Sequence, residues 1–152
     1  MSERAVRGMS QDQFLEWCQF QDANYELVDG VPVAMVGARR AHDRVVINAI
    51  RALGNQLDDN PCQPFTDDSA VRIPNGNTRR PDVGVDCGHF DPDALAVDAP
   101  RLVLEVLSPT TRTFDMFDKP DEYTTVPGLA HIVLIDPDAP QAIHWWREPD
   151  QA

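Results

Sequence analysis

A single carboxylate stands in the middle of an apolar run near the centre of the chain. Residues 102–108 read Leu-Val-Leu-Glu-Val-Leu-Ser, a pattern typical of a buried β-strand with Glu105 at its midpoint. On alternating strand geometry, Glu105 shares one face with Val103 and Leu107, and the residues between them point to the other face. Because an ionised carboxylate among aliphatic side chains is costly unless it is paired or binds a cation, Glu105 is a candidate functional residue.

A second carboxylate lies near the start of another strand-like segment, residues 81–87. Asp82 precedes Glu105 by 23 residues, and the glycine and prolines between them can turn one strand back beside the other. Two carboxylates on neighbouring strands would offer an oxygen-rich site to a hard cation such as Mg²⁺. We therefore expect Asp82 and Glu105 to hold a divalent metal; the alternatives are an arginine partner for Glu105 and a strand-end role for Asp82.

Residues 111–125 are predicted to form a helix that Pro120 interrupts. Asp115, Lys119 and Tyr123 follow one another at intervals of four, so they lie on one helix face. Because this helix follows directly from the strand of the buried carboxylate, that face can lean back over the sheet. Lys119 would then stabilise developing negative charge or hold a nucleophilic water. The alternatives are a solvated surface lysine and, for Tyr123, plain packing.

The N-terminal third is predicted to begin with a helix and a hairpin. Ser10 starts a capping-box pattern, which predicts a short helix over residues 11–20. Residues 25–35 read as a β-hairpin around Asp29 and Gly30, a pair that favours a type I′ turn. These elements would lie before the two carboxylate strands along the chain.

The longest predicted helix covers residues 40–58. Apolar residues repeat there at intervals of three or four and predict one buried face: Val46, Ile50, Leu53 and Leu57. Five strands are predicted after it: 62–73, 81–87, 101–107, 131–135 and 142–146. Two or three helices against a mixed sheet give an α+β fold, a mixed β-sheet flanked by helices.

Length and composition indicate one globular unit. The chain has 152 residues, 42% of them hydrophobic, so we predict a single domain over residues 1–152 with a real core. No apolar run approaches the roughly 20 residues of a membrane span, and Met1–Arg4 lacks the apolar core of a secretory signal. Three scattered cysteines (Cys18, Cys62 and Cys87) argue against a disulfide framework or a four-ligand zinc site and indicate a reducing cytoplasm.

The formal net charge of −12 weighs against a nucleic-acid partner, since phosphate binding normally depends on a basic surface. A bound metal and a local basic patch can nevertheless act inside an acidic protein. Basic residues do gather in the central region around the two carboxylate strands: Arg72, Arg79, Arg80, Arg101, Arg112 and Lys119. Charge alone therefore does not exclude a nuclease.

The carboxylates, the lysine and their flanking residues together resemble the motifs of a known family. Pro81-Asp82, the Glu105–Ser108 run and Lys119 are similar to the pattern of the PD-(D/E)XK nuclease superfamily. Within it, the closer resemblance is to the Uma family of restriction endonuclease-like proteins, over residues 20–147. Six ordered elements carry it: Tyr25–Gly30, His42, Pro81–Val83, Glu105–Thr110, the set Asp115, Lys119 and Tyr123, and Asp136-Pro137.

The resemblance implies a restriction-endonuclease-like fold that hydrolyses DNA phosphodiester bonds with Mg²⁺ or Mn²⁺. It implies catalytic roles for Asp82, Glu105 and Lys119, and Glu26 as a further metal ligand or else an exposed strand residue. His42 and Tyr123 become candidate substrate contacts, although a first-turn histidine also hydrogen-bonds locally. A homodimer is implied as well, since cutting two strands requires two active sites.

One departure from the superfamily pattern favours a different class of function. Leu107 occupies the position two residues after Glu105 where the superfamily has a lysine, so the resemblance implies that the lysine has moved to Lys119. The alternative is a catalytically inactive nuclease-fold binding or regulatory module.

Overall fold

The computed structural model describes residues 8–109 and 112–148, with the backbone alone for 112–115. Three helices precede runs of two, five and two strands along this part of the chain. In chain order the elements are α1 Gln11–Cys18, β1 Tyr25–Val28, β2 Val31–Ala34, α2 Arg40–Gln56, β3 Gln63–Thr66, β4 Val71–Arg72, β5 Thr78–Arg79, β6 Val83–Asp86, β7 Pro100–Val106, α3 Arg112–Tyr123, β8 His131–Asp136 and β9 Gln141–Trp146.

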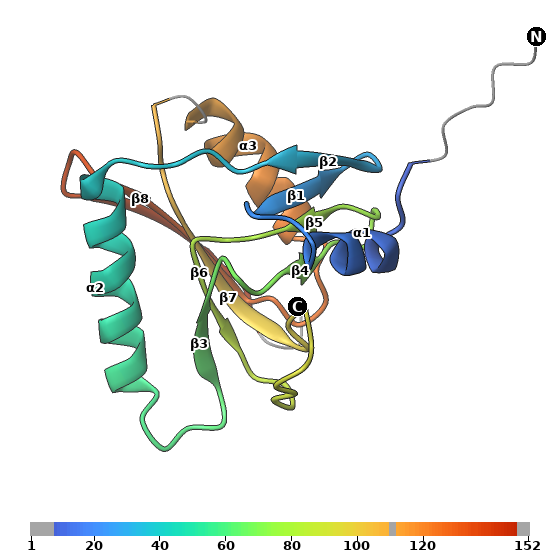
Figure 1. Cartoon of the computed structure of the whole chain (residues 1–152). Helices are drawn as coiled ribbons and strands as arrows, with labels where there is room; N and C mark the ends of the chain where they lie inside the picture. Colours follow the sequence, from blue (N-terminus) through green and yellow to red (C-terminus); the bar gives the residue numbers. More distant parts are fainter. Residues whose placement is uncertain (1–7, 110–111, 149–152) are drawn as a thin grey trace, which may run out of the picture.

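A mixed five-stranded sheet forms the centre of the fold, in the order β3-β6-β7-β8-β9 (Figure 1). Neighbouring strands of this sheet pair antiparallel, except β7 and β8, which run parallel. Because parallel strands need a crossover connection, the chain passes through α3 between β7 and β8. The predicted adjacency of the two carboxylate strands is confirmed, since Val83 of β6 pairs with Leu104 of β7.

A smaller antiparallel sheet, in the order β2-β1-β5-β4, stands beside the main one. The predicted hairpin forms its edge, with Tyr25 opposite Ala34. Asp29 and Gly30 have φ angles of 51° and 79°, the positive values that a type I′ turn requires. The capping box of α1 is also present, since the Ser10 side chain accepts from the backbone N–H of Gln13.

The two faces of the main sheet are covered by different elements. On one face α2 packs its apolar side, including Val46 and Leu53, against β6 and β7 residues such as Leu104. On the other face Val103 of β7 lies in a core cluster with Tyr123 of α3. The predicted alternation along β7 is therefore confirmed, and it directs Glu105 to the α3 side. No helix in the described ranges is long and apolar enough to cross a membrane.

Apart from shifts of one or two residues at the ends of elements, three expectations differ from the structure. Residues 62–73 do not form one strand: β3 ends at Thr66, and after a turn β4 joins the smaller sheet. β5 was not predicted, because a strand of two residues shows no alternation. Pro120 lies inside α3 without ending it. Proline has no backbone N–H to donate, but the carbonyl of Pro120 accepts the backbone N–H of Thr124 at 3.0 Å.

The expectation about cysteines needs one correction. Cys62 and Cys87 form a disulfide, while Cys18 stays reduced. The pairing follows from strand register: Gln63 of β3 lies opposite Asp86 of β6, so the next residue outward on each strand is a cysteine. One such bond is less than a framework, but it links β3 to β6 at that end of the sheet.

The sheet interior leaves no room for a side chain at Gly84. This residue pairs with Phe65 across β3 and β6, and a methyl group added there would overlap the Phe65 ring. Gly84→Ala should therefore lower the free energy of unfolding by about 1–3 kcal/mol, the usual cost of overpacking a core. Urea denaturation followed by circular dichroism would measure it.

Gly54→Ala in α2 is the matched control. Nothing lies within 4 Å of a methyl group added there, so this variant should gain up to about 1 kcal/mol from helix propensity. Equal stability of the two variants would contradict the packing argument.

Candidate active site

Glu105 is buried, with 3% of its surface exposed, and its partners come from α3. The Tyr123 hydroxyl donates to Oε1 of Glu105 at 2.7 Å. The ammonium Nζ of Lys119 lies 3.6 Å from the same oxygen. The predicted helix face therefore does lean over the sheet and brings both residues to the carboxylate. Asp115, the third residue of that face, has its side chain outside the described part of the structure.

The surroundings of Glu105 oppose its ionisation. Burial, together with the nearby charges of Asp82 and Glu26, raises the pKa of Glu105 to about 8, although Lys119 and the Tyr123 hydrogen bond act against this rise. Burial and the charge of Glu105 raise the pKa of Tyr123 well above its usual value. The tyrosine therefore stays a hydrogen-bond donor at neutral pH.

Asp82 lies directly before β6 and touches both β7 and α2. Its Oδ2 accepts the backbone N–H of Val106 at 2.7 Å, which fixes the carboxylate next to the end of β7. Nε2 of His42, in the first turn of α2, lies 3.3 Å from the same oxygen. His42 is thus placed beside the predicted metal ligand, where it has a partner inside the protein.

Glu26 reaches the site from β1 of the smaller sheet. Its Oε2 accepts the backbone N–H of Arg80 at 2.8 Å. Its Oε1 lies 3.6 Å from Nη1 of Arg79 and 3.9 Å from Nζ of Lys119. Lys119 therefore bridges Glu26 and Glu105, and cations approach Glu26 where the resemblance suggested a metal.

A partly buried ion pair that sequence reasoning missed connects α3 to the smaller sheet. Nε of Arg79, on β5, lies 2.6 Å from Oε2 of Glu122, and Nδ2 of Asn77 donates to Oε1 at 2.6 Å. Burial by itself would raise the pKa of Glu122, but these hydrogen bonds hold it below its usual value. No spacing in the sequence signals this pair, because its members are 43 residues apart.

The donor set fits one kind of metal better than another. Among the described residues, no three histidine, cysteine or acidic side chains form a group that could hold a metal ion by themselves. Magnesium commonly uses only one or two carboxylates and completes its shell with waters and substrate phosphates. Asp82 and Glu105, whose charges repel each other, match that requirement, whereas a closed tetrahedral zinc site does not fit.

Tyr123 has a partner inside the protein. Its side chain is fully buried, and its hydroxyl is directed to Glu105. A substrate contact by Tyr123 or His42 stays a prediction.

The expected central basic patch is not a free surface. Arg79 and Arg80 are buried, and Arg80 donates to the backbone carbonyls of Tyr25 and Asp68. Arg72 pairs with Asp12 at 2.8 Å on the α1 side. Most of the described basic residues around the carboxylate strands therefore hold the fold together; the side chain of Arg112 lies outside the described part.

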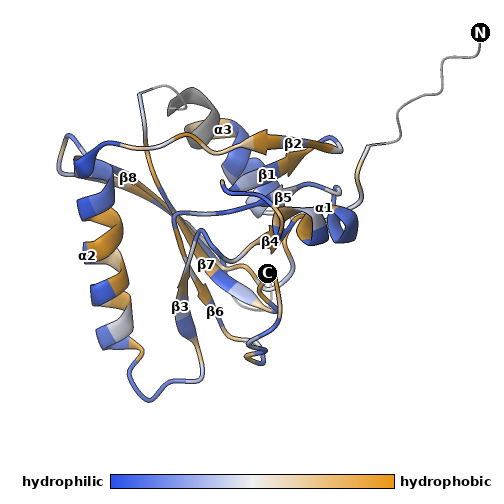
Figure 2. Cartoon of the chain, in the orientation of Figure 1, coloured by the Kyte–Doolittle hydropathy of each residue, from blue (hydrophilic) through white to orange (hydrophobic). Residues whose placement is uncertain are grey.

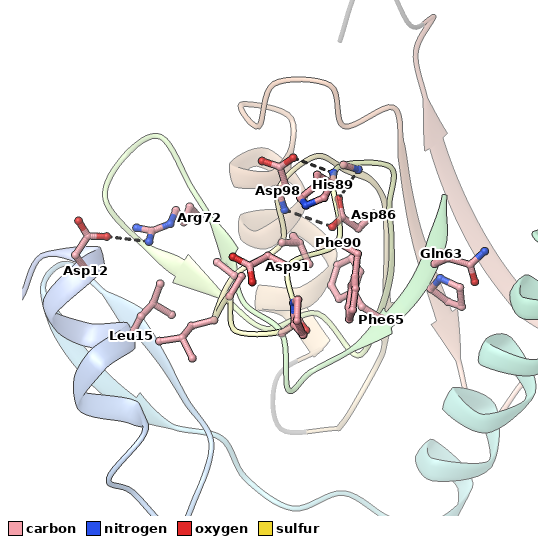
Figure 3. Close-up of a pocket in the computed structure, with 18 of the residues that line it drawn as sticks. Asp12, Leu15, Gln63, Phe65, Arg72, Asp86, His89, Phe90, Asp91 and Asp98 are labelled. Atoms are coloured by element: carbon pink, nitrogen blue, oxygen red, sulfur yellow. Dashed lines mark hydrogen bonds and ion pairs between the residues drawn. The ribbon is translucent and has the colours of Figure 1, made fainter. Parts of the chain in front are cut away.

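A large pocket lies elsewhere. It has a volume of about 1050 Å³ and is lined by residues such as Phe65, Arg72 and Phe90, but by none of the predicted site residues (Figure 3). One of its acidic side chains, Asp86, has structural partners: it accepts the backbone N–H of Ala99 at 2.8 Å and that of Gly88 at 3.0 Å. We therefore place the candidate chemistry at Asp82 and Glu105.

The burial of Glu105 predicts a pH dependence of stability in the metal-free protein. Between pH 4.5 and about 8 the native state keeps a proton that the unfolded chain has released. The free energy of unfolding should therefore fall as pH rises through this window, by up to about 1.4 kcal/mol per pH unit from this group. Glu105→Gln should remove that slope in urea denaturation with EDTA present.

Glu16→Gln, which removes an exposed carboxylate on α1, is the matched control and should keep the wild-type slope. Identical pH slopes for wild type and Glu105→Gln would contradict a protonated buried carboxylate.

Comparison with known proteins identifies a family for this chain. The model of the Uma2 family, described as "Putative restriction endonuclease", matches residues 11–152. An uncharacterized protein of Synechocystis is 31% identical over 129 residues, which cover 84% of this chain and 68% of that protein. A second Synechocystis protein is 29% identical over 130 residues, covering 83% and 73%.

A solved structure from Anabaena variabilis, described as "a putative nuclease belonging to DUF820", superimposes with a TM-score of 0.71. The alignment covers 95% of this chain and 82% of the Anabaena chain at 17% identity, so this similarity supports the fold alone. Because the family match spans nearly all of the sequence, the chain belongs to the Uma2 family and has the α+β, restriction-endonuclease-like fold that its motifs predicted.

Proposed function

We propose that this protein is a metal-dependent nuclease that hydrolyses the phosphodiester bonds of DNA. One observation carries the proposal: the ammonium group of Lys119 lies 3.6 Å from the buried carboxylate of Glu105, in a neighbourhood that also contains the charge of Asp82. Buried acidic groups with a shifted pKa beside a specific cation are typical of catalytic sites. We also propose that residues 1–152 act as one domain.

Asp82 and Glu105 would hold Mg²⁺ or Mn²⁺. A divalent ion bound there would supply Lewis-acid polarisation of the phosphate and activation of a water. The protein residues around it do the positioning: the Val106 N–H and His42 fix Oδ2 of Asp82, and the Tyr123 hydroxyl fixes Oε1 of Glu105. Fixed ligands limit the reorganisation needed during the reaction.

Lys119 would stabilise negative charge on the phosphate or orient the attacking water. It is the only lysine of the chain, and Leu107, in the usual lysine position, is buried with 4% exposed. Since only the location of the ammonium group matters, a lysine from α3 can replace one from β7. Glu26 holds the other side of this ammonium group at 3.9 Å.

A binding or regulatory module without activity is the second candidate. It is favoured by the net charge of −12 and by the internal pairing of Arg79 and Arg80, which removes them from substrate binding. Cleavage of plasmid DNA with Mg²⁺ or Mn²⁺ separates the two candidates, with Asp82→Ala as the inactive reference. If the wild type cleaves no DNA under any metal condition, the binding or regulatory module becomes the favoured candidate.

Replacing Lys119 should separate metal binding from catalysis. Lys119→Met keeps the length of a side chain that is only 12% exposed, so the fold should be retained better than with alanine. Cleavage should fall by roughly 10²–10³-fold, as when one electrostatic contact to the transition state is removed. Mn²⁺ binding measured by calorimetry should persist, whereas Glu105→Gln should abolish it.

Lys119→Arg should recover only part of the rate, because a guanidinium group is not a compact point charge. Wild-type cleavage by Lys119→Met would refute a catalytic lysine on α3, and unchanged Mn²⁺ binding by Glu105→Gln would refute the metal site.

We further propose a homodimer that forms through β9. This strand ends the five-stranded sheet, and all six of its residues are exposed. Ile143, Trp145 and Trp146 have exposed fractions of 38%, 41% and 64%, and the strand has no lysine, acidic residue or proline of the kind that usually protects an edge. Antiparallel pairing of two β9 strands would give a twofold-symmetric dimer.

Light scattering at micromolar concentration should give twice the chain mass for wild type and the monomer mass for Ile143→Lys. Phe20→Lys, at an apolar side chain that is 83% exposed outside β9, should leave the dimer intact. A monomeric wild type would remove this part of the proposal.

A further inference from the structure

The outer face of α2 carries a row of arginines. Arg40, Arg44 and Arg51 are all exposed. At 3.6 residues per turn they fall within a narrow sector of the helix, opposite the apolar side that packs on the sheet through residues such as Ala49. Arg51 lies eleven residues after Arg40, or roughly 16 Å along the helix axis. The face is thus a continuous basic strip rather than scattered charges.

This strip contrasts with the charge of the rest of the protein. Residues 39–51 contain four arginines and one aspartate, in a chain whose net charge is −12. Within the described ranges, neither Arg40 nor Arg44 forms an ion pair. Arg39 pairs with Asp138 at 2.6 Å, but both side chains are more than half exposed, so this pair contributes little to stability and can exchange partners.

The basic strip begins next to the candidate active site. His42, in the first turn of α2, points inward to Asp82 at 3.3 Å, while Arg40 and Arg44 lie on the outer side of the same two turns. In Figure 1 α2 stands at one side of the main sheet, with α1 on the opposite side of the molecule. Figure 2 shows the hydrophilic bands that alternate with apolar ones along α2.

We propose that the row of Arg40, Arg44 and Arg51, with Arg39 directly before the helix as a further contact, binds the phosphate backbone of the DNA duplex whose bond is cut at Asp82 and Glu105. The proposal deepens the nuclease function and depends on it for the identity of the partner. Duplex DNA carries one negative charge per about 1.7 Å of its axis, so a stretch as long as this strip carries about ten phosphates, of which the strip would contact those on the side that faces it. Arginine suits such contacts because its guanidinium group can donate two parallel hydrogen bonds to phosphate.

Salt dependence of DNA binding tests the surface separately from catalysis. The full chain is titrated against a fluorescently labelled 30-base-pair duplex in EDTA, where no metal-dependent cleavage occurs, and anisotropy is measured at several KCl concentrations. Each lost phosphate contact should reduce the slope of log K against log [salt] by about 0.9. Arg44→Gln should therefore lose about one unit of slope, and Arg40→Gln/Arg44→Gln about two.

Arg72→Gln is the matched control for Arg44→Gln, because it also removes one exposed positive charge but lies on the α1 side, paired with Asp12. It should keep the wild-type slope. If Arg44→Gln and Arg72→Gln bind with the same slope, or if wild type does not bind the duplex at low salt, the proposal is overturned.

The two proposals can fail independently. A wild type that cleaves DNA while the α2 variants bind normally would overturn the surface and keep the nuclease. Salt-dependent binding through α2 without any cleavage would keep the surface and overturn the nuclease.

Discussion

A carboxylate in the middle of a buried strand must find partners for its oxygens inside the protein, and much of this fold follows from that requirement at Glu105. The strand itself supplies aliphatic neighbours, so the partners have to come from another element. Tyr123 and Lys119 provide them from α3, which lies over the sheet between two parallel strands. The β7-α3-β8 crossover thus joins the two parallel strands and also brings the hydrogen-bond and charge partners of Glu105 to it.

The smaller sheet contributes to the same site through a second, partly buried interaction. Arg79 contacts Glu122 of α3 on one side and Glu26 of β1 on the other. Buried ion pairs seldom add much to stability, because desolvation offsets the attraction, but a broken one is costly. This arginine therefore fixes the position of α3 relative to the hairpin. The distance between Lys119 and Glu26 depends on that placement.

The elements that could be predicted are those whose signal is local. The alternation along residues 102–108 predicted which face Glu105 occupies, and the four-residue spacing after it predicted the approach of Lys119. The interactions that could not be predicted depend on register and tertiary contact. The division of residues 62–73 between two sheets could not be predicted, because β4 is only two residues long and shows no period. The Cys62–Cys87 bond follows from the pairing of β3 with β6, which composition does not reveal.

The acidic net charge of the chain is a poor guide to nucleic-acid binding, because electrostatic interactions in solution are local. At physiological salt the Debye length is about 8 Å, so carboxylates in a loop such as residues 86–98 are largely screened from a phosphate docked elsewhere. What a duplex meets is the charge within one such length of the contact. Most of the described basic residues near the carboxylate strands are held in internal pairs, as Arg79 is, whereas on the outer side of α2 three arginines are exposed together. The proposed docking of a polyanion on α2 therefore depends on the position of a few arginines on one helix, whereas the net charge of −12 adds a long-range repulsion that salt screens.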